Sequence, residues 1–359
     1  MSMRIKKHLK KLIPYAPDSI DYKIRLNANE SPFNETIKLL SKIKTGSLSS
    51  QIKKNSINRY PDPSYSNLLN KISRKHKVKT SNIVLSNGSD ELILYLLMCL
   101  TGKTSRILTF DPTFSMYQIL SEVLKIKCNK VPLDKNFDIP INITLKKIKE
   151  YDPDIIFIAS PNNPTGNYFS EDKILEIIEN ANGLVVIDEA YADYSKKSFI
   201  QSLKKYKNLA ILKTMSKVGF ASLRVGFLIA SKETIEIINK VRLPYNLSTL
   251  SNIIAQDFFD NDKKYSKNIQ KIVKERDRIN IALKSYDKFK VYPSDSNFIF
   301  IRYRKTRSLY KYLLNHDINI KVFGNPKLKD YFRVSIGTKK ENDLILSCIK
   351  NFFNKNLKY

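Results

Sequence analysis

A lysine and an arginine stand in one of the least polar parts of the chain, the stretch ILKTMSKVGFASLRVGF of residues 211–227. Lys217 lies in a turn of small residues after an apolar run, and Arg224 opens the next apolar run. Burial in apolar surroundings disfavours the ammonium form of a lysine and makes its amine a better nucleophile near neutral pH. Such amines form Schiff bases with carbonyl compounds. Taken alone, the stretch also permits a lysine on a solvated loop and an arginine in an ion pair.

Hydroxyl groups accompany these two cations. Thr214 and Ser216 lie three positions and one position before Lys217 in the sequence. Together with the Arg224 guanidinium, which offers a fork of N–H donors, they suit the binding of a phosphate group. The region therefore offers both an amine for a carbonyl compound and a cradle for an anion.

A second candidate anion site follows the apolar run NIVLS, in the segment NGSDE of residues 87–91. Gly88 permits a tight turn, and Ser89 and Asp90 begin a helix whose first backbone N–H groups are free to face an anion. A glycine–serine–aspartate sequence at a helix start is more often an ordinary cap, so the segment alone is a weak signal.

Acidic residues follow another pattern typical of a buried strand. Asp188 and Glu189 come directly after LVVI, and Tyr191 follows them. Carboxylates at the end of a buried parallel strand cost several kcal/mol unless a positive group meets them. A helix N-cap is also possible here, although two acids and a tyrosine coincide at the end of one strand.

Two further loops present amide or aromatic groups. The loop SPNNPTG, residues 160–166, sets Asn162 and Asn163 between two prolines, which predicts a rigid loop that exposes amide side chains. In DPTFSMYQ, residues 111–118, Phe114 could stack on a flat ring or be an ordinary buried aromatic.

The elements that must position these loops alternate along the chain. From about residue 80, strand-like runs (NIVLS, RILTF, IIFIA, LVVID, LAILK, VGFLIA) alternate with helical patterns such as EDKILEIIENA. This order predicts an α/β fold with a mostly parallel sheet and helices on both faces, and ligands of such sheets bind at the carboxyl ends of the strands. The last part of the chain instead predicts a smaller α+β unit. We expect a large domain over 46–262 and a small domain made of 1–45 and 263–359.

Composition narrows the class of protein. The chain has 359 residues, 42% hydrophobic and 27% charged, as in soluble globular proteins. Its longest apolar run, Leu92–Leu100, is about half of the roughly 20 residues that a membrane span needs. Three scattered cysteines and three scattered histidines predict no metal site and reduced thiols, and no secretory signal is evident, so we expect a cytoplasmic protein.

The formal charge of +29 raises the alternative of a nucleic-acid-binding protein. The basic runs IKKHLKKL, SRKHKVK and QSLKKYK are dispersed, however, and none interleaves arginine with aromatic residues as a base-stacking surface would. We therefore expect no nucleic-acid and no membrane partner, and interpret the charge as a lysine-rich surface.

Taken together, the loops supply a lysine for an aldehyde, a phosphate cradle, a carboxylate and a stacking aromatic, which are the requirements of pyridoxal 5'-phosphate (PLP). Together with LNANE, RYPDP, NNPTG, DEAY, SKVGFASLRVG, RLPYN and RVSIGT, they resemble the class I/II, fold type I PLP-dependent aminotransferases. Within these, the resemblance is to the histidinol-phosphate branch and covers nearly the whole chain.

This resemblance implies roles for residues at matching positions. Lys217 would be the Schiff-base lysine that also moves the substrate proton, and Asp188 would pair with the pyridine nitrogen. Asn163 and Tyr191 would hydrogen-bond the phenolic oxygen, and Phe114 would stack on the ring. The phosphate would be held by Ser89, Asp90, Thr214, Ser216, Arg224 and Tyr60.

The resemblance also implies partners and substrates. Tyr60 would reach the site of a partner subunit, which implies a homodimer. Arg333 would take the substrate α-carboxylate by a bidentate pair, with glutamate as amino donor. Asn29, Tyr15 and Lys321 match positions that contact substrate, and Lys321 stands where relatives often have an arginine for the substrate phosphate.

The expected reaction moves an amino group between glutamate/2-oxoglutarate and L-histidinol phosphate/imidazole acetol phosphate, in histidine biosynthesis. Two alternatives remain open. One is an aminotransferase of the same branch that uses a smaller phospho-ketone such as dihydroxyacetone phosphate. The other is a fold type I decarboxylase of a phosphorylated amino acid. The seven positions from Lys217 to Arg224, where many relatives have eight, mark a variant turn.

Overall fold

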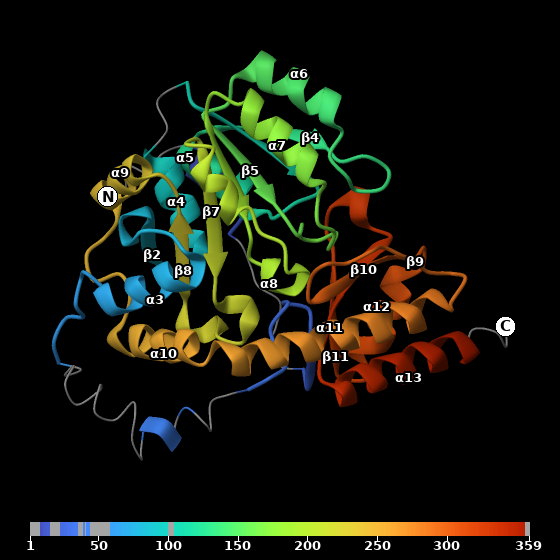
Figure 1. Cartoon of the computed structure of the whole chain (residues 1–359). Coiled ribbons are helices and arrows are strands. Elements are labelled where there is room, and N and C mark those ends of the chain that lie inside the picture. Colours follow the sequence, from blue (N-terminus) through green and yellow to red (C-terminus); the bar gives the residue numbers. More distant parts are fainter. Residues whose placement is uncertain are drawn as a thin grey trace, which may run out of the picture.

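The computed structural model of the chain describes residues 8–14, 22–34, 39, 41–43, 58–99 and 104–355. Its strands form two separate sheets, one of seven strands and one of five. Figure 1 shows the larger sheet among the helices of the first two thirds of the chain, and the smaller sheet among the C-terminal helices.

The larger sheet is mostly parallel, as the sequence predicts. Its order is β2-β8-β7-β6-β5-β3-β4, and only β8 runs antiparallel to its neighbours. The strands are β2 (Ile83–Asn87), β3 (Arg106–Asp111), β4 (Lys127–Pro132), β5 (Ile155–Ala159), β6 (Leu184–Asp188), β7 (Leu209–Thr214) and β8 (Val225–Ile229).

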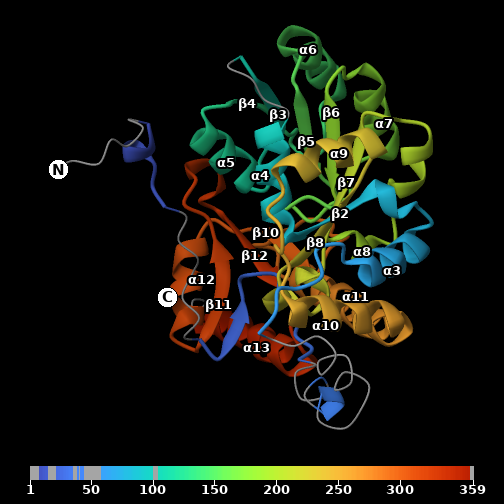
Figure 2. The ribbon, with the colours of Figure 1, turned by 90° about the vertical axis from the view of Figure 1, so that its left-hand side faces the viewer.

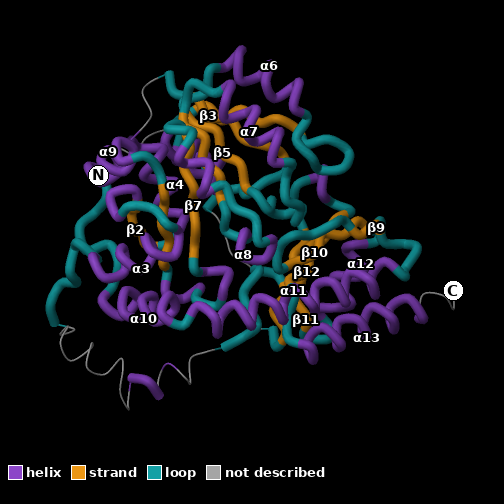
Figure 3. The backbone as a smooth tube through the Cα atoms, viewed as in Figure 1, coloured by secondary structure: helices purple, strands orange, loops and turns teal. Residues whose placement is uncertain are grey.

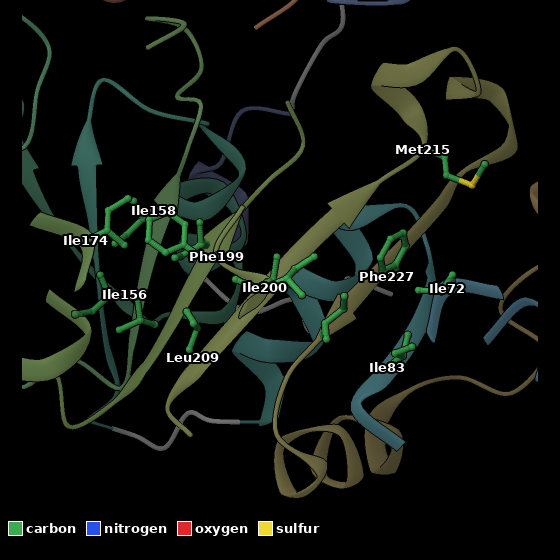
Figure 4. Close-up of a cluster of buried hydrophobic side chains, with 14 of the residues drawn as sticks. Ile72, Ile83, Ile156, Ile158, Ile174, Phe199, Ile200, Leu209, Met215 and Phe227 are labelled. Atoms are coloured by element: carbon green, nitrogen blue, oxygen red, sulfur yellow. The ribbon is translucent and has the colours of Figure 1, made fainter. Parts of the chain in front are cut away.

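Helices cover both faces of this sheet, and the strand residues divide between two cores accordingly. Ile156 and Ile158 of β5 belong to one apolar cluster, whereas Ile155 and Phe157 belong to the other. Figure 4 shows part of the first cluster. The covering helices are α3 (Ser66–His76), α4 (Ser89–Cys99), α5 (Met116–Leu124), α6 (Ile141–Tyr151), α7 (Glu171–Asn180), α9 (Lys232–Val241) and α10 (Thr249–Asp260).

The smaller sheet combines the two ends of the chain. Its order is β1-β11-β12-β10-β9, with β1 parallel to β11 and the remaining pairs antiparallel. Figure 2 shows β1 beside β11. The strands are β1 (Ile24–Leu26), β9 (Lys290–Val291), β10 (Phe298–Arg302), β11 (Ile318–Val322) and β12 (Tyr331–Ser335).

Three helices and a core of its own support this second sheet. The helices are α11 (Asp262–Lys284), α12 (Thr306–Leu314) and α13 (Lys339–Lys355), and α11 extends from the large sheet to the small one (Figure 3). Ile299, Ile301 and Val334 pack with Leu309 and Ile349 of the helices. β1 joins part of the N-terminal segment to the small sheet. The domain bounds stay a prediction, and the boundary at 45/46 lies outside the described residues.

Two kinds of feature are absent from the described ranges. None of their helices has the length and apolarity that a membrane crossing requires. Within the same ranges, no group of three or more His, Cys, Asp or Glu side chains is placed to hold a metal ion.

Candidate active site

A cavity of about 750 Å³ lies between the carboxyl ends of the parallel strands and one face of the small sheet. Most of the residues selected from the sequence line it. They are Asn29, Ser89, Asp90, Phe114, Asn163, Asp188, Tyr191, Thr214, Ser216, Lys217, Arg224, Lys321 and Arg333.

Tyr60 is not among the residues of this wall. Tyr60 is 81% exposed, and its ring stacks on that of Tyr245 with 4.6 Å between centroids. Tyr15 lies outside the described residues.

Lys217 sits in the short helical turn η4 (Ser216–Val218) that follows β7. Its Nζ donates to the Ala28 carbonyl oxygen at 3.3 Å and lies 6.0 Å from the centre of the Tyr191 ring. Its own carbonyl oxygen accepts a hydrogen bond from the Tyr194 hydroxyl at 2.6 Å, which fixes the turn. Lys217 lines the cavity, and no described carboxylate forms an ion pair with it.

Asp188 is the buried acid of the cavity. Its carboxylate accepts hydrogen bonds from the Tyr117 hydroxyl at 2.7 Å and from the Ala190 amide at 3.0 Å. Burial raises the pKa of Asp188 to about 6, although these two donors and the charge of Lys217 act in the opposite direction. Both donors to Asp188 are neutral, so a cationic group of a ligand in the cavity would stabilise its buried carboxylate further.

Glu189, the next residue, faces away from the cavity and is already neutralised. Its carboxylate accepts from Lys213 Nζ at 2.9 Å, from the Ser198 hydroxyl at 2.7 Å and from the Phe199 amide at 2.6 Å. Burial is the largest single influence on the pKa of Lys213 and lowers it, but the charges of Glu189, Asp193 and Asp188 and the hydrogen bond to Glu189 together outweigh burial, so the pKa is raised. The pair is therefore a structural element of the core.

The candidate anion cradle combines a helix start with two hydroxyls and a guanidinium. Helix α4 begins at Ser89, after Gly88 in a left-handed conformation (φ +86°). A Cβ on Gly88 would lie 2.4 Å from Arg224 Nη2, so only glycine lets the arginine approach the helix start this closely. Arg224 also donates to the Ser216 hydroxyl at 3.4 Å, and its ion pair with Asp90 has an N–O distance of 3.3 Å.

The small sheet reaches into the cavity through two polar links. Arg333 donates to Asn163 Oδ1, and to the Asn27 carbonyl oxygen at 2.5 Å. Asn29, which has a left-handed backbone (φ 55°), donates to the Tyr191 hydroxyl at 2.9 Å. Each link joins a residue of the small-sheet side to a loop of the large sheet, so the site requires both sheets.

The family model for aminotransferase class I and II matches residues 21–349. The chain belongs to this family. The resemblance stated from the motifs is thereby confirmed, as is the aminotransferase identification, and the match includes all but one of the residues selected from the sequence, Tyr15.

The sequences of two histidinol-phosphate aminotransferases align with most of this chain. The histidinol-phosphate aminotransferase of Vesicomyosocius okutanii is 37% identical over 343 residues, 94% of each chain. That of Aquifex aeolicus is 37% identical over 349 residues, covering 96% of this chain and 97% of the relative.

Solved structures confirm the fold. The histidinol-phosphate aminotransferase from Clostridium acetobutylicum has a TM-score of 0.83 at 25% identity and covers 92% of this chain and 99% of its own. The enzyme from Sinorhizobium meliloti, in complex with pyridoxal-5'-phosphate, has a TM-score of 0.87 at 20% identity, over 98% and 99% of the two chains.

The aminotransferase site also contains residues that the sequence did not reveal. Tyr117 is fully buried, and its ring stacks on Phe157 at 4.8 Å and meets Phe114 edge-on at 5.6 Å. It therefore supports both Phe114 and Asp188. Arg25 of β1 is a further cation in the cavity wall. Nothing in the sequence pattern of either residue differs from an ordinary amphipathic element.

Proposed function

We propose that this protein is a PLP-dependent aminotransferase that moves an amino group between glutamate/2-oxoglutarate and L-histidinol phosphate/imidazole acetol phosphate, in histidine biosynthesis. The observation that carries the proposal is the meeting of Lys217, Asp188 and the start of helix α4 in one cavity. The names of the curated relatives and the PLP complex of the Sinorhizobium meliloti neighbour support it.

The donor set of the cavity fits PLP. Asp188, buried and with a raised pKa, suits the pyridine nitrogen, and Phe114 suits one face of the ring. Asn163 and Tyr191 offer polar groups for the phenolic oxygen. The phosphate would be held by the backbone of Ser89 and Asp90 and by Thr214, Ser216 and Arg224, with Tyr60 of a partner subunit.

When bound, PLP supplies an electron sink that makes the Cα proton of an amino acid removable. The residues of this chain do the remaining work. The Lys217 amine takes that proton and returns it, since its described polar contact is a single 3.3 Å bond to a carbonyl oxygen. Arg333 orients the α-carboxylate of glutamate, and its bonds to Asn163 and the Asn27 carbonyl hold the guanidinium in place.

The phosphorylated substrate would contact Lys321 and Asn29, and we propose Tyr15 as a further contact. Lys321 lines the same cavity as Arg333, and the two are paired across β11 and β12. A phosphate next to Lys321 would therefore lie on the small-sheet side of the substrate. The alternatives of a smaller phospho-ketone or a phospho-amino acid decarboxylase gain no support from the names of these curated relatives.

We propose a cytoplasmic homodimer in which Tyr60 enters the site of the partner subunit. Tyr60 is 81% exposed and stacks on Tyr245, next to the exposed Leu243 and Leu250 of the same stretch. Mixing tests this arrangement. Lys217→Ala and Tyr60→Ala chains, each impaired alone, should form heterodimers in which one site regains wild-type activity. Activity that stays at the average of the two parents would contradict a contribution across the interface.

The acceptor assay tests the reaction itself. Purified protein should carry the yellow absorbance of bound PLP, and glutamate should bleach it. Adding imidazole acetol phosphate should restore the band, whereas dihydroxyacetone phosphate at equal concentration should restore it far more slowly. The proposed function fails if glutamate leaves the band unchanged, or if carbon dioxide is released from a phospho-amino acid instead.

A further inference from the structure

Three cationic side chains lie on the cavity side of the small sheet. Arg25 of β1, Lys321 of β11 and Arg333 of β12 all line the active-site cavity. The strand register explains why, because Arg25 pairs with Asn319 of β11 and Lys321 pairs with Arg333 of β12. Residues two apart on a strand share a face, so Asn319 and Lys321 project to the same side, and their partners project with them. Adjacent strands thus present a row of three cations.

Arg333 and Arg25 differ in the protein groups that already bind their guanidinium. Arg333 is buried and donates to Asn163 and to the Asn27 carbonyl oxygen. The side chain of Arg25 is 44% exposed, and its closest described carboxylate oxygen, that of Glu30, lies 3.9 Å away. This distance is too long for a hydrogen bond, and exposed ion pairs of this kind contribute little to stability. A ligand can therefore engage the Arg25 guanidinium at little cost.

Arg25 and Lys321 are close enough to hold one anion together. Neighbouring strands lie about 4.8 Å apart and two residues of a strand span about 6.6 Å, so the two Cα atoms are separated by roughly 8 Å. Both side chains are long, and both reach the same cavity. A phosphate monoester carries roughly two negative charges and three acceptor oxygens near neutral pH, which is more than a single ammonium group can satisfy.

We propose that Arg25 and Lys321 together form the subsite for the phosphate of the substrate. Lysine is a point charge without the planar fork that matches phosphate, and Arg25 supplies that fork from the neighbouring strand. Arg333, at the other end of the row, remains available for the α-carboxylate of glutamate, the substrate that has no phosphate. The identity of the substrate as a phosphate ester rests on the proposed function, but the affinity of this wall for a phosphate monoester does not.

Binding of glycerol 3-phosphate to the PLP-loaded protein tests the proposal. The probe has neither amino nor keto group and cannot react, and bound PLP occupies the cradle at Arg224. We expect Arg25→Gln to weaken binding about 10-fold in isothermal titration, and Arg25→Lys to recover part of the loss. Glu30→Gln, which removes the competing carboxylate beside Arg25, should tighten binding.

Lys23→Gln is the matched control. Lys23 lies two residues before Arg25, is 85% exposed in its ion pair with Asp317, and is not among the described residues of the cavity wall. Its loss of charge should change the affinity less than twofold. The proposal is overturned if Arg25→Gln binds the probe as wild type does, or if Lys23→Gln weakens binding equally. A failure of glutamate to bleach the cofactor, with the Arg25 effect intact, would instead reject only the proposed function.

Discussion

Two lysines and two carboxylates lie near the carboxyl ends of β6 and β7, but only Lys213 and Glu189 form an ion pair with each other. Lys213 and Glu189 are fully inside the protein and neutralise each other at 2.9 Å. Lys217 follows Lys213 by four residues and Asp188 precedes Glu189 by one, yet both Lys217 and Asp188 line the cavity. Asp188 receives an O–H and an N–H from neutral groups, and Lys217 donates to a carbonyl oxygen.

Lys213 and Glu189 stabilise the fold, whereas the charged groups of Lys217 and Asp188 are left for a ligand. The inner pair has Ser198 and Phe199 as additional donors, so Glu189 has no need of a ligand. Lys217 and Asp188 instead remain able to bind groups of a ligand. Because Asp188 is buried without a cationic partner, its pKa is raised. Function and stability should therefore respond in opposite ways when the two pairs are changed.

The largest effect is expected from Lys217→Ala. Loss of the amine should lower the transamination rate by at least about 10³-fold, since it removes the group that carries the substrate proton. The free energy of unfolding of the cofactor-free protein should change by less than about 0.5 kcal/mol, because the side chain is only partly buried. Steady-state kinetics and urea unfolding measure the two quantities. Substantial residual activity would remove the contrast between the pairs.

Changing the inner lysine should have the reverse profile. Lys213→Met leaves Glu189 buried without a counter-charge and should lower the free energy of unfolding by about 3–5 kcal/mol. The double variant with Glu189→Gln should recover most of this loss, because neither charge then remains buried. Urea unfolding of both variants provides the check. A single variant as stable as wild type would show that the pair is dispensable.

Asp188→Asn should stabilise the cofactor-free protein while it impairs catalysis. Because burial raises the pKa of Asp188 from 3.8 to about 6, the folded state binds an additional proton between these values. The stabilisation that this proton gives the folded state is therefore fully present below pH 3.8, and it is lost as the pH rises through about 6. At pH 7 the variant should be more stable by up to about 3 kcal/mol. Equal differences at pH 4 and pH 7 would refute this origin.

The smallest effect is expected from Tyr117→Phe. The ring and its stacking on Phe157 are kept, but the hydroxyl that donates to Asp188 at 2.7 Å is lost. The pKa of Asp188 should then rise further, because that hydrogen bond acts to lower it. We expect about a 10-fold loss of activity, or roughly 1.4 kcal/mol, together with weaker retention of the cofactor. Unchanged cofactor affinity and rate would leave Tyr117 as a packing residue only.

The strand–helix alternation was sufficient to predict the large sheet except for its edge strand β4. Lys127, Asn129 and Lys130 make that strand polar, and since it pairs only with β3 within the described sheet, it lacks the apolar pattern of the buried strands. Loop residues at the carboxyl ends were predictable because parallel strands bring their carboxyl ends to one edge. Their detailed roles stay predictions.

What the sequence could not show depends on pairing across elements. Glu189 finds Lys213 because β6 and β7 are neighbours in the register that sets Asp188 opposite Leu212. Arg25 enters the cavity wall because β1 pairs with a strand almost three hundred residues later in the chain. Tyr117 reaches Asp188 from a helix whose apolar pattern predicts only packing. None of these contacts leaves a local signature along the chain.

The tight contact between β8 and the start of α4 has a consequence for mutational scanning. Gly226 of β8 lies against the backbone of that helix start, so a Cβ there would come within 2.5 Å of the Ser89 amide nitrogen. Alanine at this position would displace the very N–H groups that an anion is expected to meet. A scan would then rank Gly226 with Lys217, although the glycine offers no side-chain atom to any reaction. The helix start depends on the absence of a side chain at Gly226.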